Sequence, residues 1–326
     1  MKNKPVIGIL IPPAFIKTVF NDADLEELKA LGECRFHDSS QQIDEAAAIE
    51  LLRDATVAIG TWGTPGPSST ILEACPNLKL WEHVAGSVRH FFGPHLEGKS
   101  LVIASCAPAI ADSVAEMTVG QIIMGLRRLV EFDCCMKEGR KPTGLEKVNL
   151  FTAKIGIVGA SQVGRRVAKL LQPFGCEIKI TDPFLSKEEA TQMGAELEPD
   201  LLQLFAECQA VTLHTPQLPS TRQMIRAEHF AAMADHSIFV NTSRGECVDQ
   251  PALIEALKTR PLRAFIDVLD HGEDRRADEL KTLPNCFLTP HIAGGPNTRM
   301  GALAVSDTKA FLSGKSPLMA VSASDL

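Results

Sequence analysis

Short β-branched runs alternate with helical patterns twice along this chain, and this alternation limits the possible fold more than any other feature. Alternation at this spacing indicates βαβ units with parallel strands. The first series of strands, between residues 6 and 105, reads VIGILI, CRF, TVAIGTW, LKLWEHV and SLVIAS. The second, between residues 153 and 291, reads AKIGIVG, EIKITD, AVTLHTP, SIFVNTS, LRAFIDV and CFLTPH. Most of these runs are apolar throughout, as expected when helices cover both faces of a sheet.

The two series predict an α/β protein with two doubly wound parallel-sheet domains. A length of 326 residues agrees with this, since one domain takes roughly 150 residues. We expect a discontinuous flavodoxin-like domain formed by residues 1–106 and 296–326, and a Rossmann domain formed by residues 107–295. The stretch from residue 296 to about 313 reads as a helix that returns to the first domain.

Composition excludes several classes of function. The net charge is -7 and the basic residues are scattered, so a nucleic-acid partner has little electrostatic support. We see no apolar run long enough to cross a bilayer, which argues against a membrane partner. The chain has no tyrosine, which excludes oxidoreductases of the short-chain type, whose general acid is a tyrosine.

Cysteine usage indicates a reducing compartment. The nine cysteines are odd in number and contain no C-x-x-C pair, which argues against a disulfide framework and against a zinc site. The N-terminal run MKNKPVIGILIPP is broken by two prolines and reads as a first strand rather than a signal peptide. We therefore expect a cytoplasmic protein without a bound metal.

The stretch IGIVGASQVGRRVAKLL resembles the turn that holds the pyrophosphate of a dinucleotide. Gly159 and Gly164 occupy the first and third glycine positions of that fingerprint, and Ser161 replaces the second. A strand precedes the turn and a helix follows it, as the motif requires. Serine tolerates a near approach of the cofactor if its φ stays negative. We therefore expect a modified turn that still binds the cofactor, through Gln162 and Val163 as well as through the three fingerprint positions.

Asp182 ends the strand EIKITD, beyond the glycine turn. A carboxylate there accepts hydrogen bonds from the adenosine ribose hydroxyls and repels a ribose phosphate. The sequence therefore favours NAD over NADP. The alternative for Asp182 is a strand-end aspartate that caps the next turn.

Polar residues follow three further strands, in NTSRG, IDVLD and TPHIAGG. The carboxyl ends of parallel strands face the ligand crevice of an open α/β sheet, so these residues should converge. Hydride transfer to a keto acid needs a proton donor, a cation that holds the substrate and a carboxylate that keeps the donor charged. Histidine, arginine and aspartate suit those three tasks.

In this order, the segments GASQVG, TDP, LHTP, VNTSRGECVD, IDVLD and LTPHIAGG resemble the D-isomer-specific 2-hydroxyacid dehydrogenase family. The resemblance implies that Arg244 binds the substrate and that His291 is the acid/base. It implies an acidic partner for the imidazole: Asp270 keeps its spacing from Asp267 without a gap, whereas another alignment selects Glu273. The implied cofactor-binding residues, besides those of the glycine turn and Asp182, are His214, Thr215, Pro216, Thr221, Thr242, Ser243 and Asp267.

The resemblance also implies a carboxylate-binding backbone loop in the first domain, matched here by Ala85, Gly86 and Ser87. The expected activity is interconversion of a small 2-keto acid and its D-2-hydroxy acid with NAD. Related dehydrogenases, such as those for formate or phosphite, share the cofactor half of the fold. The alternative from another class is an NAD-binding sensor that docks partners with little catalysis. The apolar segment 108–138 suggests a homodimer, with intramolecular packing as the alternative.

Overall fold

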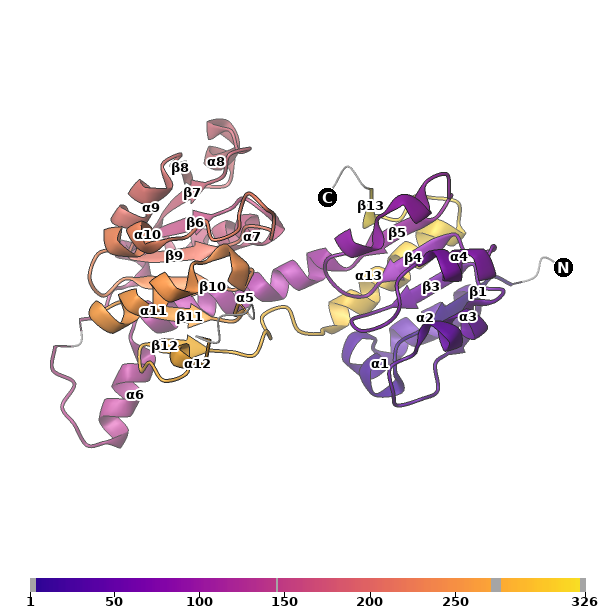
Figure 1. Ribbon diagram of the computed structural model, residues 1–326, viewed down its shortest axis with the longest axis horizontal. Helices are drawn as coiled ribbons and strands as arrows, with labels where there is room; N and C mark the ends of the chain where they lie inside the picture. Colours follow the sequence, from indigo (N-terminus) through magenta and orange to yellow (C-terminus); the bar gives the residue numbers. More distant parts are fainter. Residues whose placement is uncertain (1–3, 145, 271–276, 323–326) are drawn as a thin grey trace. The chain divides into compact units, whose positions relative to one another are not determined.

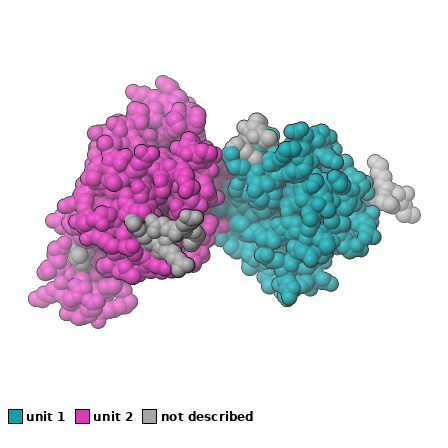
Figure 2. All heavy atoms as spheres, in the orientation of Figure 1, with its two compact units in different colours: residues 1–110, 295–326 teal, residues 111–294 magenta. Residues whose placement is uncertain are grey.

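The computed structural model describes residues 4–144, 146–270 and 277–322. The chain forms two compact units, residues 1–110 with 295–326 and residues 111–294 (Figure 2). The sequence analysis placed the first boundary after residue 106 and the second after residue 295. The first boundary lies later because Ala109 is buried in the core of the first unit and Ile110 packs against the same cluster.

The first unit contains a six-stranded sheet in the order β13-β5-β4-β3-β1-β2 (Figure 1). Five strands are parallel: β1 (Val6–Ile9), β2 (Glu33–Phe36), β3 (Val57–Gly60), β4 (Leu80–His83) and β5 (Val102–Ser105). The edge strand β13 (Ala320–Val321) pairs antiparallel with β5, which the sequence did not predict.

Helices pack on both faces of this sheet and bury two clusters of apolar side chains. They are α1 (Pro13–Val19), α2 (Asp22–Leu31), α3 (Glu45–Leu52), α4 (Ser69–Ala74) and α13 (Thr298–Leu312). Two short 3-10 turns, η1 (Arg89–Phe91) and η2 (Pro94–Leu96), follow β4. As expected, α13 returns to the first unit, where Met300 and Ala304 lie in the core.

The second unit contains a parallel seven-stranded sheet in the order β12-β11-β10-β9-β6-β7-β8 (Figure 1). The strands are β6 (Lys154–Val158), β7 (Glu177–Thr181), β8 (Glu196–Leu197), β9 (Ala210–Leu213), β10 (Ile238–Asn241), β11 (Arg263–Ile266) and β12 (Cys286–Leu288). The helices are α6 (Leu129–Lys137), α7 (Gln162–Leu171), α8 (Lys187–Gln192), α9 (Leu201–Glu207), α10 (Ala227–Ala232), α11 (Gln250–Thr259) and α12 (Ala277–Leu280), with turns η3 (Leu150–Thr152), η4 (Gln172–Phe174) and η5 (Gly245–Cys247).

The long apolar segment that the sequence suggested is divided into two helices. Helix α5 (Ala107–Leu126) ends before Arg128, which has a φ of 54° and begins the turn into α6. The Arg128 Nε donates to Glu131, and Glu131 also accepts from Arg263 of β11. The partly buried pair between Glu131 and Arg263 joins residues 132 positions apart, so a local pattern could not locate the break.

Among the described helices, α5 is long and apolar enough to cross a bilayer by length and composition, with a mean hydropathy of 1.2. The expectation that no run reaches this limit was therefore wrong. One such helix is weak evidence of a membrane span. More than half of this window, 56%, is buried, and Ala115, Ile122 and Leu126 lie in the core cluster of the second unit. Packing inside the protein accounts for its apolar character.

Candidate active site

The candidate residues of the second unit follow strands that end in one row. The register pairs Thr181 with Val158 and Val158 with Leu213, and continues through Asn241 and Ile266 to Leu288. The residues directly after these positions are Asp182, Gly159, His214, Thr242, Asp267 and Thr289. Six strand ends therefore bring five sequence-predicted site residues, together with Thr289, to one edge of the sheet.

Ser161 modifies the glycine turn without disrupting it. Its φ is -64°, and its side chain accepts a hydrogen bond from the Gly164 nitrogen at 3.4 Å, so it is the N-cap of α7. A cap of this kind stabilises a helix by about 1 kcal/mol relative to alanine. In the described chain, no hydrogen bond is donated by the nitrogens of Gln162 and Val163. These amides at a helix N-terminus suit an anion such as a pyrophosphate.

The two glycines of this turn are required by their surroundings. Gly159 has a φ of 100°, and an added Cβ would lie 3.0 Å from the carbonyl carbon of His214. A Cβ on Gly164 would lie 2.0 Å from the Gly159 oxygen, so only glycine lets α7 approach the strand this closely. The turn thus has the geometry that a dinucleotide-binding fingerprint demands.

Asp182 is tied to the same turn. One carboxylate oxygen accepts from the Ala160 nitrogen at 2.8 Å and the other from the Phe184 nitrogen at 2.9 Å. Asp182 therefore does cap its own turn, as the alternative interpretation proposed. Each oxygen keeps a further lone pair for a hydroxyl, since a carboxylate has about four acceptor sites.

A loop after β9 joins the cofactor turn to the turn that carries Arg244. Burial lowers the pKa of His214 to about 3, so the imidazole is neutral, and its Nε2 lies 3.0 Å from the Thr212 hydroxyl. The Thr221 hydroxyl donates to the Pro216 oxygen at 2.6 Å and closes the loop. The Ser243 hydroxyl donates to the Thr215 oxygen.

The Thr215 hydroxyl is buried and has no hydrogen-bond partner within the described residues. An orphaned hydroxyl beside the glycine turn is the kind of group that a bound ligand satisfies. Together with the close approach at Gly159 and the free amides of α7, it fits a dinucleotide. The predicted cofactor contacts of Pro216 and Thr221 remain predictions.

The turn that presents Arg244 is held by a side chain that the sequence analysis did not select. Asn241 accepts from the Ser243 nitrogen at 3.0 Å and donates to the Arg244 oxygen at 3.0 Å. The guanidinium is partly exposed, and its Nη1 donates to the Ser243 oxygen at 2.7 Å. In the part of the chain that the structure describes, no ion pair joins Arg244 to Asp249, whose carboxylate instead caps α11.

Gly245 brings this turn against the end of the next strand. A Cβ at Gly245 would lie 2.1 Å from the carbonyl carbon of Leu269 and 2.2 Å from the Asp270 nitrogen. Only glycine permits this contact, so the backbones next to Arg244 and Asp270 touch. The Asp270 nitrogen also donates to the buried side chain of Gln250 at 3.2 Å.

Asp267 holds the segment that carries His291. Asp267 is 2% exposed, and its carboxylate accepts from the Thr289 hydroxyl at 2.5 Å and from the nitrogens of Ile292 and Ala293, both at 2.9 Å. His291 itself has a φ of 56°, and its backbone nitrogen donates to the backbone carbonyl oxygen of Asp267 at 2.9 Å. Asp267 therefore caps the loop, and its expected role in cofactor binding stays a prediction.

The ring of His291 is free to meet a ligand. The side chain is exposed, and its ring makes no hydrogen bond within the described residues. No hydrogen bond or ion pair links it to Asp270 there, so their pairing stays a prediction. Glu273, the alternative partner, lies outside the described residues.

The loop matched to carboxylate binding lies after β4 in the first unit. The Ser105 hydroxyl contacts the oxygens of Ala85, at 3.2 Å, and Gly86, at 2.5 Å. Among the hydrogen bonds of the described residues, none is donated by the nitrogens of Ala85, Gly86 or Ser87. Such a run of open amides suits an anion. A role in substrate binding remains a prediction of the resemblance.

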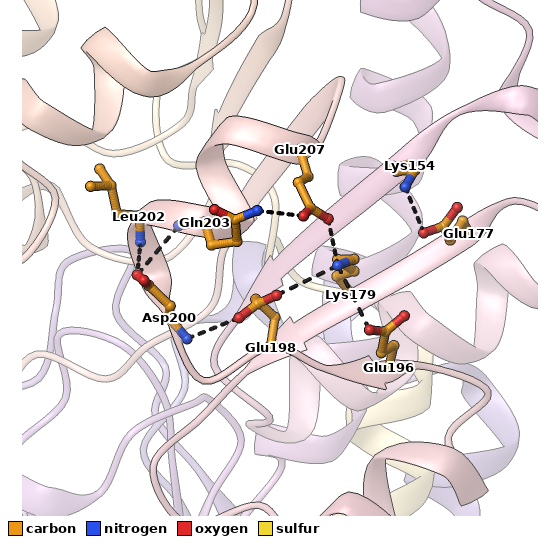
Figure 3. A network of polar contacts seen from close by, with 9 residues as sticks. All are labelled: Lys154, Glu177, Lys179, Glu196, Glu198, Asp200, Leu202, Gln203 and Glu207. Atoms are coloured by element: carbon orange, nitrogen blue, oxygen red, sulfur yellow. Dashed lines mark hydrogen bonds and ion pairs between the residues drawn. The ribbon is translucent and has the colours of Figure 1, made fainter.

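An ion network fixes the strand that leads to Asp182 (Figure 3). The Lys179 side chain in β7, 7% exposed, lies 2.5 Å from Glu207, 3.5 Å from Glu198 and 3.7 Å from Glu196. The hydrogen bond to Glu207 and the charge of Glu196 raise the pKa of Lys179. The network joins β7 to β8 and to the carboxyl end of α9, and so holds the strand that precedes Asp182.

Several of the supporting residues escaped the sequence analysis for one reason. Their hydrogen-bond partners in the site depend on the folded structure, as for Asn241, Gln250 and Thr289. The Thr118 hydroxyl of α5 likewise lies 3.0 Å from the Thr242 hydroxyl, 124 positions away in the sequence. The sequence contained one indication of such residues, namely a polar residue at or directly after a strand end, and both Asn241 and Thr289 lie at such positions.

The fold and this edge define a dinucleotide-binding oxidoreductase of the Rossmann type. A family model described as "D-isomer specific 2-hydroxyacid dehydrogenase, NAD binding domain" matches residues 119–293, more than half of the chain. The chain belongs to the D-isomer specific 2-hydroxyacid dehydrogenase family, and its cofactor is NAD.

One curated relative is similar in sequence, and two solved structures share the fold. A D-3-phosphoglycerate dehydrogenase from Methanocaldococcus jannaschii is 30% identical over 82% of this chain and 51% of its own length. The chain thus matches about half of that relative. The D-lactate dehydrogenase of Lactobacillus jensenii, solved with NAD+, has a TM-score of 0.80 at 23% identity, covering 97% of this chain and 99% of that one. The apo D-lactate dehydrogenase of Escherichia coli has a TM-score of 0.74 at 20% identity over 98% and 100%.

Proposed function

We propose that this protein reduces a small 2-keto acid to the D-2-hydroxy acid with NADH, and catalyses the reverse oxidation with NAD. One observation carries the proposal. Arg244 follows β10 and His291 follows β12, and these two strands flank β11. The residues after β11 contact both the turn that carries Arg244 and the segment that carries His291. A cation and a proton donor so arranged meet the needs of carbonyl reduction. The relatives named for D-lactate and D-3-phosphoglycerate support a 2-hydroxy acid as the product.

In this proposal, the glycine turn and Asp182 would hold NADH, and its nicotinamide would supply a hydride to the carbonyl carbon. The protonated ring of His291 donates its proton to the carbonyl oxygen as the carbon–oxygen double bond becomes a single bond. Arg244 binds the carboxylate and polarises the carbonyl, and the open amides of residues 85–87 are a further carboxylate-binding element. Asp270 is our preferred partner for the His291 ring, with Glu273 as the alternative.

Loss of NADH absorbance tests the activity with glyoxylate, pyruvate, hydroxypyruvate and bulkier keto acids. We expect His291→Ala to reduce turnover by about a thousandfold and to leave NADH binding near the wild-type value. Arg244→Lys should instead raise KM for the keto acid, because lysine cannot bind a carboxylate in a bidentate manner. Unchanged turnover in His291→Ala would remove the histidine from the mechanism.

An NAD-binding sensor is the rival function. It predicts NADH binding with no turnover of any keto acid and no effect of His291→Ala. The same assay, combined with calorimetric titration of NADH, separates the two functions. The retained turns around Arg244 and His291 favour the enzyme.

We also propose a cytoplasmic homodimer that uses residues 108–138. All nine cysteines are free, which suits a reducing compartment. Leu129 and Met136 of α6 are 50% and 72% exposed, and dimerisation would cover them. Sedimentation of Leu129→Lys should show a monomer, whereas Leu202→Lys, on the exposed surface of α9, should sediment like the wild type.

A further inference from the structure

The first unit contains a cavity of about 380 Å³ at the carboxyl end of β3 and β4. This volume lies at the lower end of the range for small-molecule sites. The lining residues are Thr64, Gly66, Pro67, Ser68, Ser69, His90, Phe91 and His95. One wall is the loop between β3 and α4, and the other is formed by η1 and η2. All of these residues belong to the first unit.

Aromatic packing gives the cavity a fixed wall. Phe91 is 4% exposed and lies with its ring centroid 6.2 Å from that of Trp81 and 4.9 Å from that of His83. The His90 ring packs edge-on against Phe91 at 4.3 Å. A Cβ on Gly66 would lie 2.7 Å from the Phe91 ring, so the opposite loop can approach it only through a glycine. The cavity is therefore shaped before any ligand arrives.

Two of the polar groups in the lining are already used by the protein. The Thr64 hydroxyl donates to the Thr61 oxygen at 2.7 Å and accepts from the Thr61 nitrogen at 2.9 Å. The Ser68 hydroxyl donates to the Glu45 carboxylate and accepts from the Ile71 nitrogen. These contacts hold the loop and leave little capacity for a ligand.

Three other polar groups keep their capacity. Within the described residues, no hydrogen bond involves the Ser69 hydroxyl or the rings of His90 and His95. A hydroxyl and two imidazoles offer both donors and acceptors, which is what a ligand hydroxyl requires. An alkyl chain would cover these groups without pairing them, at a cost in binding free energy.

The charges around the cavity favour a neutral ligand group over an anion. Among the described residues that line the cavity there is no lysine or arginine, and the Glu45 carboxylate contacts Ser68 in its wall. A second carboxylate or a phosphate on the ligand would meet that charge at short range. Hydroxyl groups avoid the repulsion.

The cavity continues from the loop of residues 85–87. The Arg89 nitrogen donates to the Ser87 hydroxyl at 3.5 Å and the Phe91 nitrogen to the Val88 oxygen at 2.9 Å, so this loop turns directly into the cavity wall. The Thr61 hydroxyl donates to the Val84 oxygen at 2.9 Å and joins the loops after β3 and β4. A keto acid bound through its carboxylate to these amides would have its carbon chain beside the cavity.

We infer that this cavity receives the carbon chain of the substrate and selects 2-keto acids with neutral hydroxyl groups beyond the keto carbon over alkyl analogues. The inference rests on the proposed reductase function and specifies its substrate class. The hydroxyls pair with Ser69, His90 and His95, and Phe91 packs against the carbon atoms between them.

The test compares isosteric substrates with the NADH-loaded enzyme. Hydroxypyruvate is paired with 2-ketobutyrate, and 4-hydroxy-2-ketobutyrate with 2-ketopentanoate, while glyoxylate, which has no carbon chain, provides the reference. We expect kcat/KM to favour the hydroxylated member of at least one pair by roughly tenfold or more. Ser69→Ala and His95→Leu should reduce that ratio severalfold. Thr70→Ala, the next residue in α4 and outside the lining, should keep it.

Two results would overturn the inference in different ways. Reduction of glyoxylate with no preference in either pair, or with a preference that both variants retain, removes the cavity from substrate selection and leaves the reductase function intact. Failure to reduce any of the five acids contradicts the proposed function itself, and the inference falls with it. Because Ser69→Ala is a small change at an exposed position, it remains informative even if His95→Leu does not fold.

Discussion

Asp267 and His291 are joined through their backbones, because the His291 nitrogen donates to the Asp267 oxygen at 2.9 Å. The Asp267 carboxylate then accepts from the two nitrogens that follow His291. This clamp maintains a φ of 56° at a residue other than glycine, a conformation that costs about 1 kcal/mol or more. The clamp thereby sets the direction in which the imidazole leaves the end of β12.

Asp267→Asn should therefore impair catalysis by displacing His291. Asparagine has one acceptor oxygen instead of two, so it cannot hold Thr289, Ile292 and Ala293 together. We expect kcat to fall by about 100-fold, as misplacement by an ångström can cause. Hydrogen exchange at Ile292 and Ala293 should become faster, which a lost ligand contact alone would not produce. Asp235→Asn, which alters an exposed pair with Arg260, is the control; equal exchange in both variants would contradict the clamp.

Asp182→Asn should shift the preference between cofactors. The substitution removes the negative charge that would repel a ribose phosphate, and it gives up one of the contacts to Ala160 and Phe184. We expect weaker NADH binding and a ratio of NADPH to NADH affinity that rises about tenfold or more. Calorimetric titration with both cofactors measures this ratio. A ratio equal to that of the wild type would show that Asp182 only supports the turn.

Features that depend on neighbouring residues could be predicted from the sequence, whereas features that depend on distant partners could not. The strand ends could be predicted because each strand is a short apolar run followed by polar residues, and the register then placed Asp182, Gly159 and Asp267 in one row. The two-residue strands β8 and β13 were missed because so short a segment carries no periodicity. The same limit applies to the site: the role of Asp267 depends on partners 22 to 26 positions away, which no local pattern specifies.

Lys179→Met should destabilise the second unit much more than Lys154→Met. The Lys179 side chain is 7% exposed and lies among three glutamates, so its loss leaves uncompensated carboxylates at a partly buried site. We expect the free energy of unfolding to fall by roughly 3 kcal/mol. Lys154 is 40% exposed and paired with Glu177 at 3.0 Å, so Lys154→Met should lower the free energy of unfolding by less than about 1 kcal/mol. Urea unfolding of the two full-length variants makes the comparison, and equal losses would contradict the importance of the network.

Glu82→Gln should stabilise the first unit at neutral and alkaline pH. Glu82 is fully buried in β4, its Oε2 has no hydrogen-bond partner within the described residues, and its Oε1 accepts from the Cys106 thiol at 3.5 Å. Burial and the charge of Asp307 raise the pKa of Glu82 well above its ordinary value of 4.5. The folded state therefore retains a proton that the unfolded state releases, and the stability that this proton provides is lost as pH rises from the ordinary value towards the raised one.

Glutamine resembles the protonated carboxyl group at every pH, so the variant should not suffer this loss. We expect its melting temperature to exceed that of the wild type at about pH 8 and to approach it below roughly pH 4, where both folded and unfolded Glu82 are protonated. Glu97→Gln, at an exposed position of the same unit, should show no such pH dependence. A constant difference between the Glu82→Gln variant and the wild type across this range would mean that packing, rather than a retained proton, determines the effect of Glu82.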